Sequence, residues 1–387
     1  MAQGRLVAAI LIGLAVAALV VASALSFIWN TGRTVSGVAD LGGLSAHPDR
    51  AMDTATLIFR HSRGELGGIA IAPLRDALAM APLEEEPFVY AAASLANAGR
   101  VVEASRLLRI AEERNPRSRE ARAMLLQHAV ADADAREAVT QIEVLHRLEP
   151  ELRPALSETL IYLAGVPTTQ QATLAAIRED RHKRDVLQGL ARWGASPSML
   201  LSAIEILGEF DLGPDRRGYV RSLVNPLLAT EDWRGARRVW SVYYPGAFDG
   251  DMPLVDPAFS GEYGPPFGWA TQDGRDGWAR TGDEGLRGRY TGLGQAELAR
   301  QLVLAEPGRY RLNIQSVDPG SGLWIEVACG SSPAFAQQQL AEEMQTVEFT
   351  AGSDCPALNL TIAARPTASQ SAQDFRIIGI EMERIAP

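Results

Sequence analysis

The sequence is poor in the residues that most often carry catalysis and metal binding. It contains one lysine, Lys183, only two cysteines, and no histidine after His182. The lack of histidine excludes a Ser/His/Asp or Cys/His arrangement from the C-terminal part. Earlier in the chain, His61, His128, His146 and His182 lack the HxxxH and HExxH spacings of zinc sites. We therefore expect no metal among them.

Positive charge is scarce in the C-terminal part, where binding of nucleic acid would need it. The net charge of the chain is −10, and from Gly246 onward 19 acidic residues stand against 10 arginines, a balance of −9. Nucleic-acid binding depends on neutralising phosphates, so we expect no nucleic-acid partner. Neutral sugars would not be repelled. The ratio of 36 arginines to one lysine is typical of a GC-rich bacterial genome.

A long apolar run stands near the N-terminus. Residues 6–29 carry no charge and follow Arg5. At about 1.5 Å per residue this run can cross a hydrocarbon core of about 30 Å. The positive-inside tendency then predicts a single-pass anchor (1–30) in a bacterial inner membrane, with the bulk of the chain periplasmic. The alternative is a signal peptide cleaved after the small-residue pattern Ala22-Ser23-Ala24, which also exports the chain.

Three prolines recur at a fixed interval. Pro82, Pro116 and Pro150 lie 34 residues apart, and each closes a stretch that reads as two short amphipathic helices. A period of this length indicates stacked helix pairs that bury a common core. Residues at matching positions are small or apolar: Ala70 and Ala77, Ala104 and Ala111, and Ala138, with Leu74, Leu108 and Ile142 between them.

The copy at residues 88–116 resembles the tetratricopeptide repeat. Gly99 occupies the turn between its helices, and Ala104 and Ala111 occupy the small positions of the second helix. This resemblance implies an α-solenoid over residues 51–245 that binds protein partners, after a tether at 31–50. The 34-residue register is lost after Pro150, but helical patterning continues over 156–164, 170–194, 198–210, 216–228 and 233–244. Four arginines are predicted to form a solvated face: Arg106, Arg109, Arg114 and Arg117.

After Pro245 the pattern changes to short alternating segments separated by glycine, proline and aspartate. This predicts an antiparallel β-sandwich over residues 246–387. Strands are expected at 287–290, 299–305, 308–316, 323–329, 345–350, 357–363 and 375–383. The fold class is therefore multidomain, α then β. Cys329 and Cys355 are predicted to form a structural disulfide if the strands at 323–329 and 357–363 are neighbours.

Three stretches of this part resemble jelly-roll carbohydrate-binding modules. They are 255–269, with Pro266-Phe-Gly-Trp269, then 301–312 with its Pro-Gly turn, and 375–383. The resemblance implies sugar binding, which uses exposed aromatic rings with nearby carboxylates or amides. The candidates are Trp278, Tyr263, Tyr290 and Asp276, whereas Trp269 and Trp324 are expected to pack in the core. Weak calcium candidates are Asp249, Asp251 and Asp256.

An enzymatic role has little support in the sequence. Glycoside hydrolysis needs two carboxylates, and Asp273, Asp276, Asp283 and Glu284 are close in sequence. A module of this size favours binding over catalysis. Gly288, Gly292 and Gly294 do not form a nucleotide-binding GxGxxG. We expect a non-enzymatic protein without a cofactor.

The order of anchor, repeats and sandwich resembles membrane-anchored proteins of bacterial exopolysaccharide assembly and export. This resemblance implies a scaffold that holds protein partners on its helices and glycan on its sandwich. The first alternative is a general envelope assembly factor without sugar binding. The second is a polysaccharide-modifying enzyme.

Overall fold

The protein is described from a computed structural model, which covers residues 74–79, 82–248, 253–318, 322–330, 332–341, 343–368 and 371–385. The expected anchor (1–30) and tether (31–50), His61, Asp249 and Asp251 lie outside these residues. In the described part, no helix is long and apolar enough to cross a membrane. The chain divides into two compact units, Met1–Leu190 with Ala203–Phe210, and Ala191–Ser202 with Asp211–Pro387.

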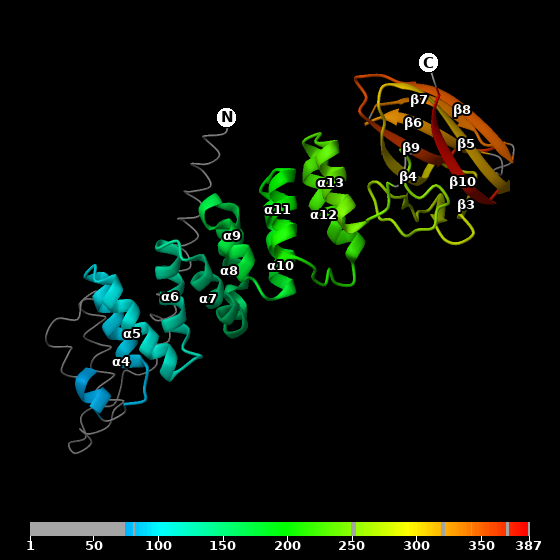
Figure 1. Ribbon diagram of the computed structural model, residues 1–387. Coiled ribbons are helices and arrows are strands. Elements are labelled where there is room, and N and C mark those ends of the chain that lie inside the picture. The colour runs from blue at the N-terminus through cyan, green and yellow to red at the C-terminus, as the bar shows by residue number, and fades with distance from the viewer. Residues whose placement is uncertain are drawn as a thin grey trace. The chain divides into compact units, whose positions relative to one another are not determined.

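Helices follow one another along the chain up to Tyr243 (Figure 1). Residues 74–79 are helical. The next ones are α4 (Glu86–Asn97), α5 (Val101–Arg114), α6 (Arg119–Ala131), α7 (Ala135–Leu148), the 3-10 helix η2 (Pro150–Leu152), α8 (Arg153–Gly165), α9 (Pro167–Ala176), α10 (Asp180–Arg192), α11 (Pro197–Leu207), α12 (Arg216–Ala229) and α13 (Trp233–Tyr243).

The repeat positions pack as the sequence predicts. Gly99 takes a φ of +77° in the turn between α4 and α5, a conformation that glycine adopts without steric cost. Ala104, Leu108 and Ala111 of α5 are fully buried, and Ala138 and Ile142 of α7 are buried in the same way. Small side chains at these points allow the paired helices to approach closely. Pro82 and Pro116 lie in turns after a helix, and Pro150 opens η2.

A buried polar network ties α5, α6 and α7 together. Arg122 on α6 is only 7% exposed, and its Nη1 lies 2.9 Å from Glu112 Oε1 and 2.9 Å from Gln141 Oε1. Gln141 Nε2 donates to Glu112 Oε1 at 3.1 Å and to Glu137 Oε1 at 2.7 Å. Burial raises the pKa of Glu112, but the bonds from Gln141 and Arg109 and the charge of Arg122 outweigh it, so the net shift is downward.

Arg109 does not lie on a purely solvated face. Its guanidinium bridges Glu112 of its own helix at 2.9 Å and Glu137 of α7 at 2.8 Å. Arg114 covers the ring of Phe88, with its Cζ 4.3 Å from the ring centroid. These two arginines therefore contribute to helix packing, which the sequence pattern did not predict.

Two buried histidines meet between α7 and α10 in the first unit. The rings of His146 and His182 are 4.6 Å apart, edge to face. His146 Nδ1 and both ring nitrogens of His182 have no hydrogen-bond partner in the described structure. Burial lowers the pKa of His146 to about 4, with further lowering by Arg181, His182 and Arg153. Burial also lowers the pKa of His182, partly opposed by Glu179, Glu143 and Asp185.

The helix expected at 170–194 is interrupted. Helix α9 ends at Ala176, and Ile177 is extended, with φ −65° and ψ 125°. The amide of Arg178 then donates to Glu143 Oε1 at 2.8 Å, so the chain turns against α7 before α10 begins. This hydrogen bond joins residues 35 apart in sequence at the point of the break, a contact that periodicity does not report.

The C-terminal part is a sandwich of two five-stranded sheets, in which every paired strand is antiparallel. Sheet A has the order β1-β4-β9-β6-β7, and sheet B has the order β2-β3-β10-β5-β8. The strands are β1 (Ala270–Thr271), β2 (Gly277–Arg280), β3 (Leu286–Tyr290), β4 (Ala296–Leu304), β5 (Gly308–Asp318), β6 (Leu323–Cys329), β7 (Ala334–Gln339), β8 (Met344–Ala351), β9 (Ala357–Ala364) and β10 (Gln373–Ile385). Apolar side chains from both sheets form the core between them.

All seven expected strands are present, and three observed strands were not predicted. Strands β1 and β2 are two and four residues long, and β7 (AFAQQQ) is largely polar and exposed. All three lie at the edges of their sheets. An edge strand is often short and carries polar side chains, so alternation of apolar and polar residues need not mark it in the sequence.

The disulfide between Cys329 and Cys355 is present. Strands β6 and β9 are neighbours, with Cys329 opposite Leu358, and the two cysteine Cα atoms are 5.5 Å apart. The bond links residues 26 apart in sequence, a loop whose closure stabilises a fold by about 3.5 kcal/mol in the chain-entropy model.

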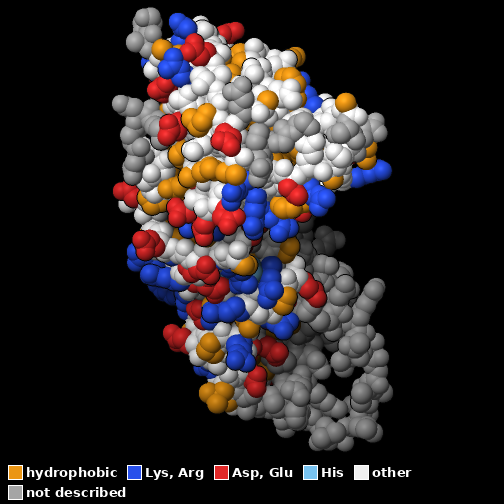
Figure 2. Space-filling view, turned by 90° about the vertical axis from the view of Figure 1, so that its right-hand side faces the viewer, with side chains coloured by type: hydrophobic (Ala, Val, Ile, Leu, Met, Phe, Trp, Pro, Cys, Tyr) orange, Lys and Arg blue, Asp and Glu red, His pale blue; other side chains and the backbone are white. Residues whose placement is uncertain are grey.

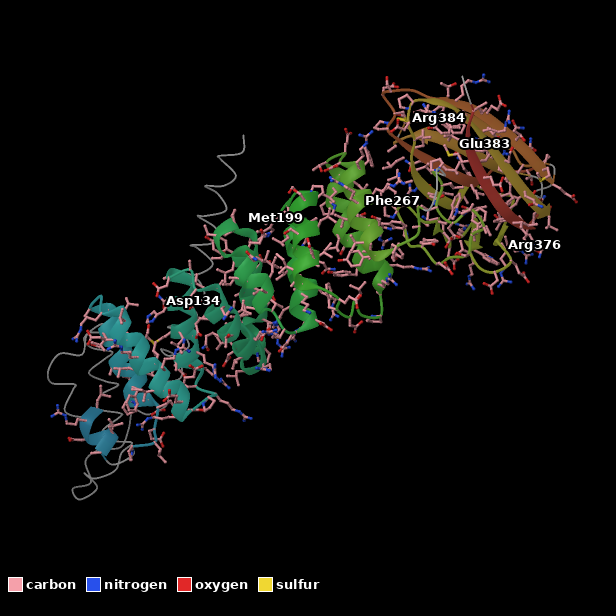
Figure 3. The ribbon with its side chains drawn as sticks, viewed as in Figure 1. Asp134, Met199, Phe267, Arg376, Glu383 and Arg384 are labelled. Carbon is pink, nitrogen blue, oxygen red and sulfur yellow. A yellow bond between two sulfur atoms is a disulfide. The ribbon has the colours of Figure 1, made fainter. Side chains whose placement is uncertain are left out.

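The last helix pair packs against the segment that leads into the sandwich. Trp240 of α13 is fully buried, and its Nε1 donates to the carbonyl oxygen of Gly264 at 3.0 Å. Its ring lies 5.6 Å from Phe267 (labelled in Figure 3), 4.5 Å from Tyr244 and 6.4 Å from Tyr263, measured between centroids. The expected boundary at 245/246 therefore falls inside the second compact unit.

The face of the molecule drawn in Figure 2 mixes charges of both signs. In the view of Figure 2, Lys and Arg side chains are interspersed with Asp and Glu side chains and with hydrophobic ones. A large field of one sign is not visible on that face.

Candidate functional site

Trp278 presents its ring on the outer face of sheet B. It lies on the edge strand β2, between Gly277 and Ala279, which are both buried and face the core. Trp278 itself is half-buried, pairs with Arg289 of β3, and has the Arg280 Cζ 5.4 Å from its ring centroid. Gly288 of β3 allows this arrangement, because a Cβ there would collide with the carbonyl oxygen of Trp278. An edge tryptophan facing outward can stack on an apolar sugar face.

An open polar hollow adjoins Trp278 along the chain. It has a volume of about 460 Å³ and is formed by the β1–β2 loop and by β4. Its polar lining comprises Gln272, Asp273, Arg275, Asp276, Glu297 and Arg300. Glu297 and Arg300 approach each other at 3.6 Å. Among the described residues, Asp273, Arg275 and Asp276 form no ion pair, so these side chains remain available to bond hydroxyl groups.

Of the predicted sugar-binding residues, Asp276 lines the hollow and Trp278 follows two residues later on β2, whereas the two tyrosines pack elsewhere. Tyr290 is 1% exposed, and its hydroxyl donates to Gln373 Oε1 at 2.7 Å. Tyr263 packs 6.1 Å from the Tyr244 ring in the aromatic cluster around Trp240. The Tyr290 ring is therefore enclosed in the core, whereas Tyr263 is half-buried and belongs to the aromatic cluster around Trp240.

The two tryptophans expected in the core differ from each other. Trp269 is 5% exposed, stacks on Phe259 at 4.7 Å, and donates from Nε1 to the carbonyl oxygen of Asp256 at 3.0 Å. Trp324 is not a core residue: it alternates with the buried Leu323 and Ile325 on β6 and is half-buried on the outer face of sheet A. Its alternation with apolar neighbours could have indicated this orientation.

Asp256, the calcium candidate that lies within the described residues, uses its carboxylate to hold the loop that follows it. Asp256 is 5% exposed and takes a φ of +56°. Its carboxylate accepts from the backbone amides of Ser260 at 2.6 Å and Gly261 at 2.9 Å. Among the described residues, no group of three His, Cys, Asp or Glu side chains is placed to hold a metal ion.

The four carboxylates weighed for hydrolysis do not form one group. Asp273 and Asp276 line the hollow, whereas Asp283 and Glu284 follow β2 in the loop to β3. Glu284 Oε2 lies 3.9 Å from Arg287 and 3.9 Å from Arg376 on the outer face of sheet B. The hollow and this face therefore have different chemistry: the hollow mixes acids and bases, and the face carries mainly arginine.

No protein-family model and no curated protein matches the chain. Similar solved structures each cover part of it. PilF from Pseudomonas aeruginosa is 14% identical and covers 51% of this chain and 92% of its own, with a TM-score of 0.28. MamA from Desulfovibrio magneticus is 12% identical over 51% of this chain and 93% of its own, with a TM-score of 0.24. The module TmCBM61, solved with β-1,4-galactotriose, is 14% identical over 35% of this chain and 100% of its own, with a TM-score of 0.25.

Proposed function

We propose that this chain is a non-enzymatic adaptor of bacterial exopolysaccharide or cell-envelope polysaccharide assembly and export. In this proposal an N-terminal helix tethers it to the inner membrane and its bulk lies in the periplasm. The helical repeats hold protein partners, and the sandwich holds glycan beside Trp278.

The placement of Trp278 carries the glycan part of this proposal. Its ring faces outward on β2, and the loop just before it supplies Asp276, Asp273 and Gln272 to the open hollow. Stacking on an aromatic ring, together with carboxylate and amide groups for the hydroxyls, is the chemistry that sugar recognition requires. Because the hollow is open to solvent, it suits binding better than a reaction that depends on excluding water.

Two features support the proposed location and the protein-binding role. The Cys329–Cys355 disulfide is of the kind that persists in an oxidising compartment, and the apolar run at 6–29 is long enough to serve as an anchor. Repeated helix pairs such as α4–α5 and α6–α7 build the extended surfaces that repeat proteins use to bind partners.

Affinity electrophoresis of the full chain through gels containing acidic or neutral polysaccharides tests the glycan claim. We expect at least one polysaccharide to retard the chain, and Trp278→Ala to abolish the retardation. Trp324→Ala is the matched control, because Trp324 is also half-buried on an outer sheet face under an arginine, with Arg365 Cζ 4.2 Å from its ring. Failure of every polysaccharide to retard the chain, or equal losses in the two variants, would contradict the proposal.

A further inference from the structure

Arginines gather on the outer face of sheet B beside Trp278. On three adjacent strands, Arg280 of β2 pairs with Arg287 of β3, and Arg287 pairs with Arg376 of β10. Each alternates with buried neighbours, so all three point outward (Arg376 is labelled in Figure 3). Arg289, two residues along β3, lies opposite Trp278. We call Trp278 and these four arginines the arginine face.

The carboxylates near these arginines are few and distant. Among the described side chains, Glu284 lies 3.9 Å from both Arg287 and Arg376, and Asp374 lies 3.8 Å from Arg289. These distances exceed hydrogen-bond length. Arg280 has no ion pair in the described structure and lies over the Trp278 ring. In the strand register, Asp318 of β5 also lies opposite Arg376, so the four arginines outnumber their neighbouring acidic residues by one.

A second row on the same sheet shows what full pairing looks like. Arg311 of β5 lies between Glu348 of β8 and Glu383 of β10, with nitrogen–oxygen distances of 2.8 and 3.1 Å. The hydrogen bond from Arg311 lowers the pKa of Glu348. Arg309 adds a further contact to Glu348 at 3.2 Å. The same sheet thus pairs arginine closely with carboxylates on β5, β8 and β10, whereas the ion pairs of the arginine face on β2, β3 and β10 are longer.

Three arginines in one cross-strand row carry an energetic penalty. Directly opposite residues have Cβ atoms about 5 Å apart, and like charges there destabilise the sheet. The C-terminal part contains 19 acidic residues against 10 arginines, yet the described ion pairs bring only Glu284 and Asp374 to the arginine face. An anionic ligand would offset the repulsion. The Trp278 ring at the end of this face favours an anion that also has an apolar flat side.

We propose that the arginine face binds an acidic glycan, a polymer whose sugar units carry carboxylates. This inference rests on the proposed glycan binding and names its substrate class. Guanidinium groups match carboxylates in planar, two-point hydrogen bonding, while the tryptophan stacks on the sugar ring. Nucleic acid fits less well, because duplex DNA carries one charge per about 1.7 Å, and the surrounding module is acidic, whereas a polyuronate carries one charge per sugar unit.

The test measures binding of the full chain to polygalacturonate and to its methyl ester, which has the same sugar without the charge. We expect tighter binding of polygalacturonate than of the ester, weakened by added salt. The double variant Arg287→Gln/Arg376→Gln should lower the affinity for polygalacturonate roughly tenfold or more and leave the ester unaffected. The control Arg309→Gln/Arg311→Gln removes the same charge from the same sheet and should change neither affinity.

The contradicting results separate this inference from the function on which it rests. Equal binding of polygalacturonate and its ester would overturn the acidic-glycan inference and leave glycan binding standing. Binding of neither, and of no other polysaccharide, would overturn both. Equal losses in the two double variants would show a nonspecific charge effect, and single-stranded DNA bound as tightly as polygalacturonate would show a general anion surface. Either result would overturn the inference.

Discussion

The helical repeats and the sandwich differ in where they place arginine: the repeats bury one, and the sandwich keeps all of its described arginines at least partly exposed. In the first unit, the described structure buries the charged Arg122 between helices, paired with Glu112. In the sandwich, every described arginine is at least partly exposed, and the group at 280, 287, 289 and 376 lies on an outer face. Buried charge must be paired and therefore fixes how helices stack. Exposed charge with few partners is available to a ligand.

The largest expected effect comes from cutting the chain before residue 246, where the sequence pattern changes from helical to strand-like. A fragment of residues 246–387 loses Trp240, whose ring packs on Phe267 and whose indole binds Gly264. We expect it to aggregate or to unfold at least about 3 kcal/mol more easily than a fragment of residues 211–387, since loss of a buried tryptophan costs about this much. Denaturant unfolding of both fragments measures the difference. Equal stabilities would show that α12 and α13 are not part of the sandwich unit.

Removing the buried arginine of the repeats should have the next largest effect. Arg122→Ala leaves Glu112 and Gln141 without their shared partner, and we expect the free energy of unfolding to fall by about 3 kcal/mol. Arg106→Ala, on the same helical part, is the control and should change stability little. Urea denaturation followed by circular dichroism at 222 nm monitors the helices. A loss no greater than that of the control would contradict the network's role.

Acid should destabilise the helical part through its two buried histidines. The pKa of His146 is about 4 in the folded chain and about 6.5 when unfolded, so the unfolded state binds more protons between these values. Stability is full above pH 6.5 and falls as the pH drops toward 4, by at most about 3 kcal/mol at about 1.4 kcal/mol per pKa unit. His146→Leu should flatten the slope of stability against pH between 6.5 and 5. An unchanged slope would show that His146 is not buried in its neutral form.

The smallest effect concerns the arginine face itself. Arg287→Gln relieves repulsion from Arg280 and Arg376, so we expect a gain in stability of a few tenths of a kcal/mol. Arg311→Gln should act in the opposite direction, because it removes the partner of Glu348 and Glu383. Differential scanning calorimetry of both variants measures the sign. Equal losses would show that the two rows are electrostatically alike.

The sequence predicted the parts of the fold that depend on local pattern. The 34-residue period located α4 to α7, and the alternation of apolar and polar residues located seven strands. The spacing of apolar residues shows which side of a helix or strand faces the core. The prediction failed where distant segments decide the outcome. The break between α9 and α10 coincides with a hydrogen bond from the Arg178 amide to Glu143 of α7, and the edge strand β7 has no apolar alternation to reveal it.

The candidate site was only partly predictable. Trp278, predicted from its polar surroundings to be exposed, is half-buried and faces outward, whereas Tyr290 and Tyr263 are held by packing that no local pattern reveals. The arginine face could not be foreseen, because Arg280, Arg287 and Arg376 come together only through strand order and register. Pairing β10 with β3 brings residues about ninety positions apart side by side.

Hydrogen–deuterium exchange of the full chain with and without an oligogalacturonate tests the central claim most directly. The account predicts slower exchange over residues 272–290, which contain the hollow, β2 and β3, and unchanged exchange over 323–339 and over α4 to α7. Protection confined to 323–339 or to the helices would place the ligand elsewhere. The absence of any protection at saturating oligosaccharide would contradict binding at this face.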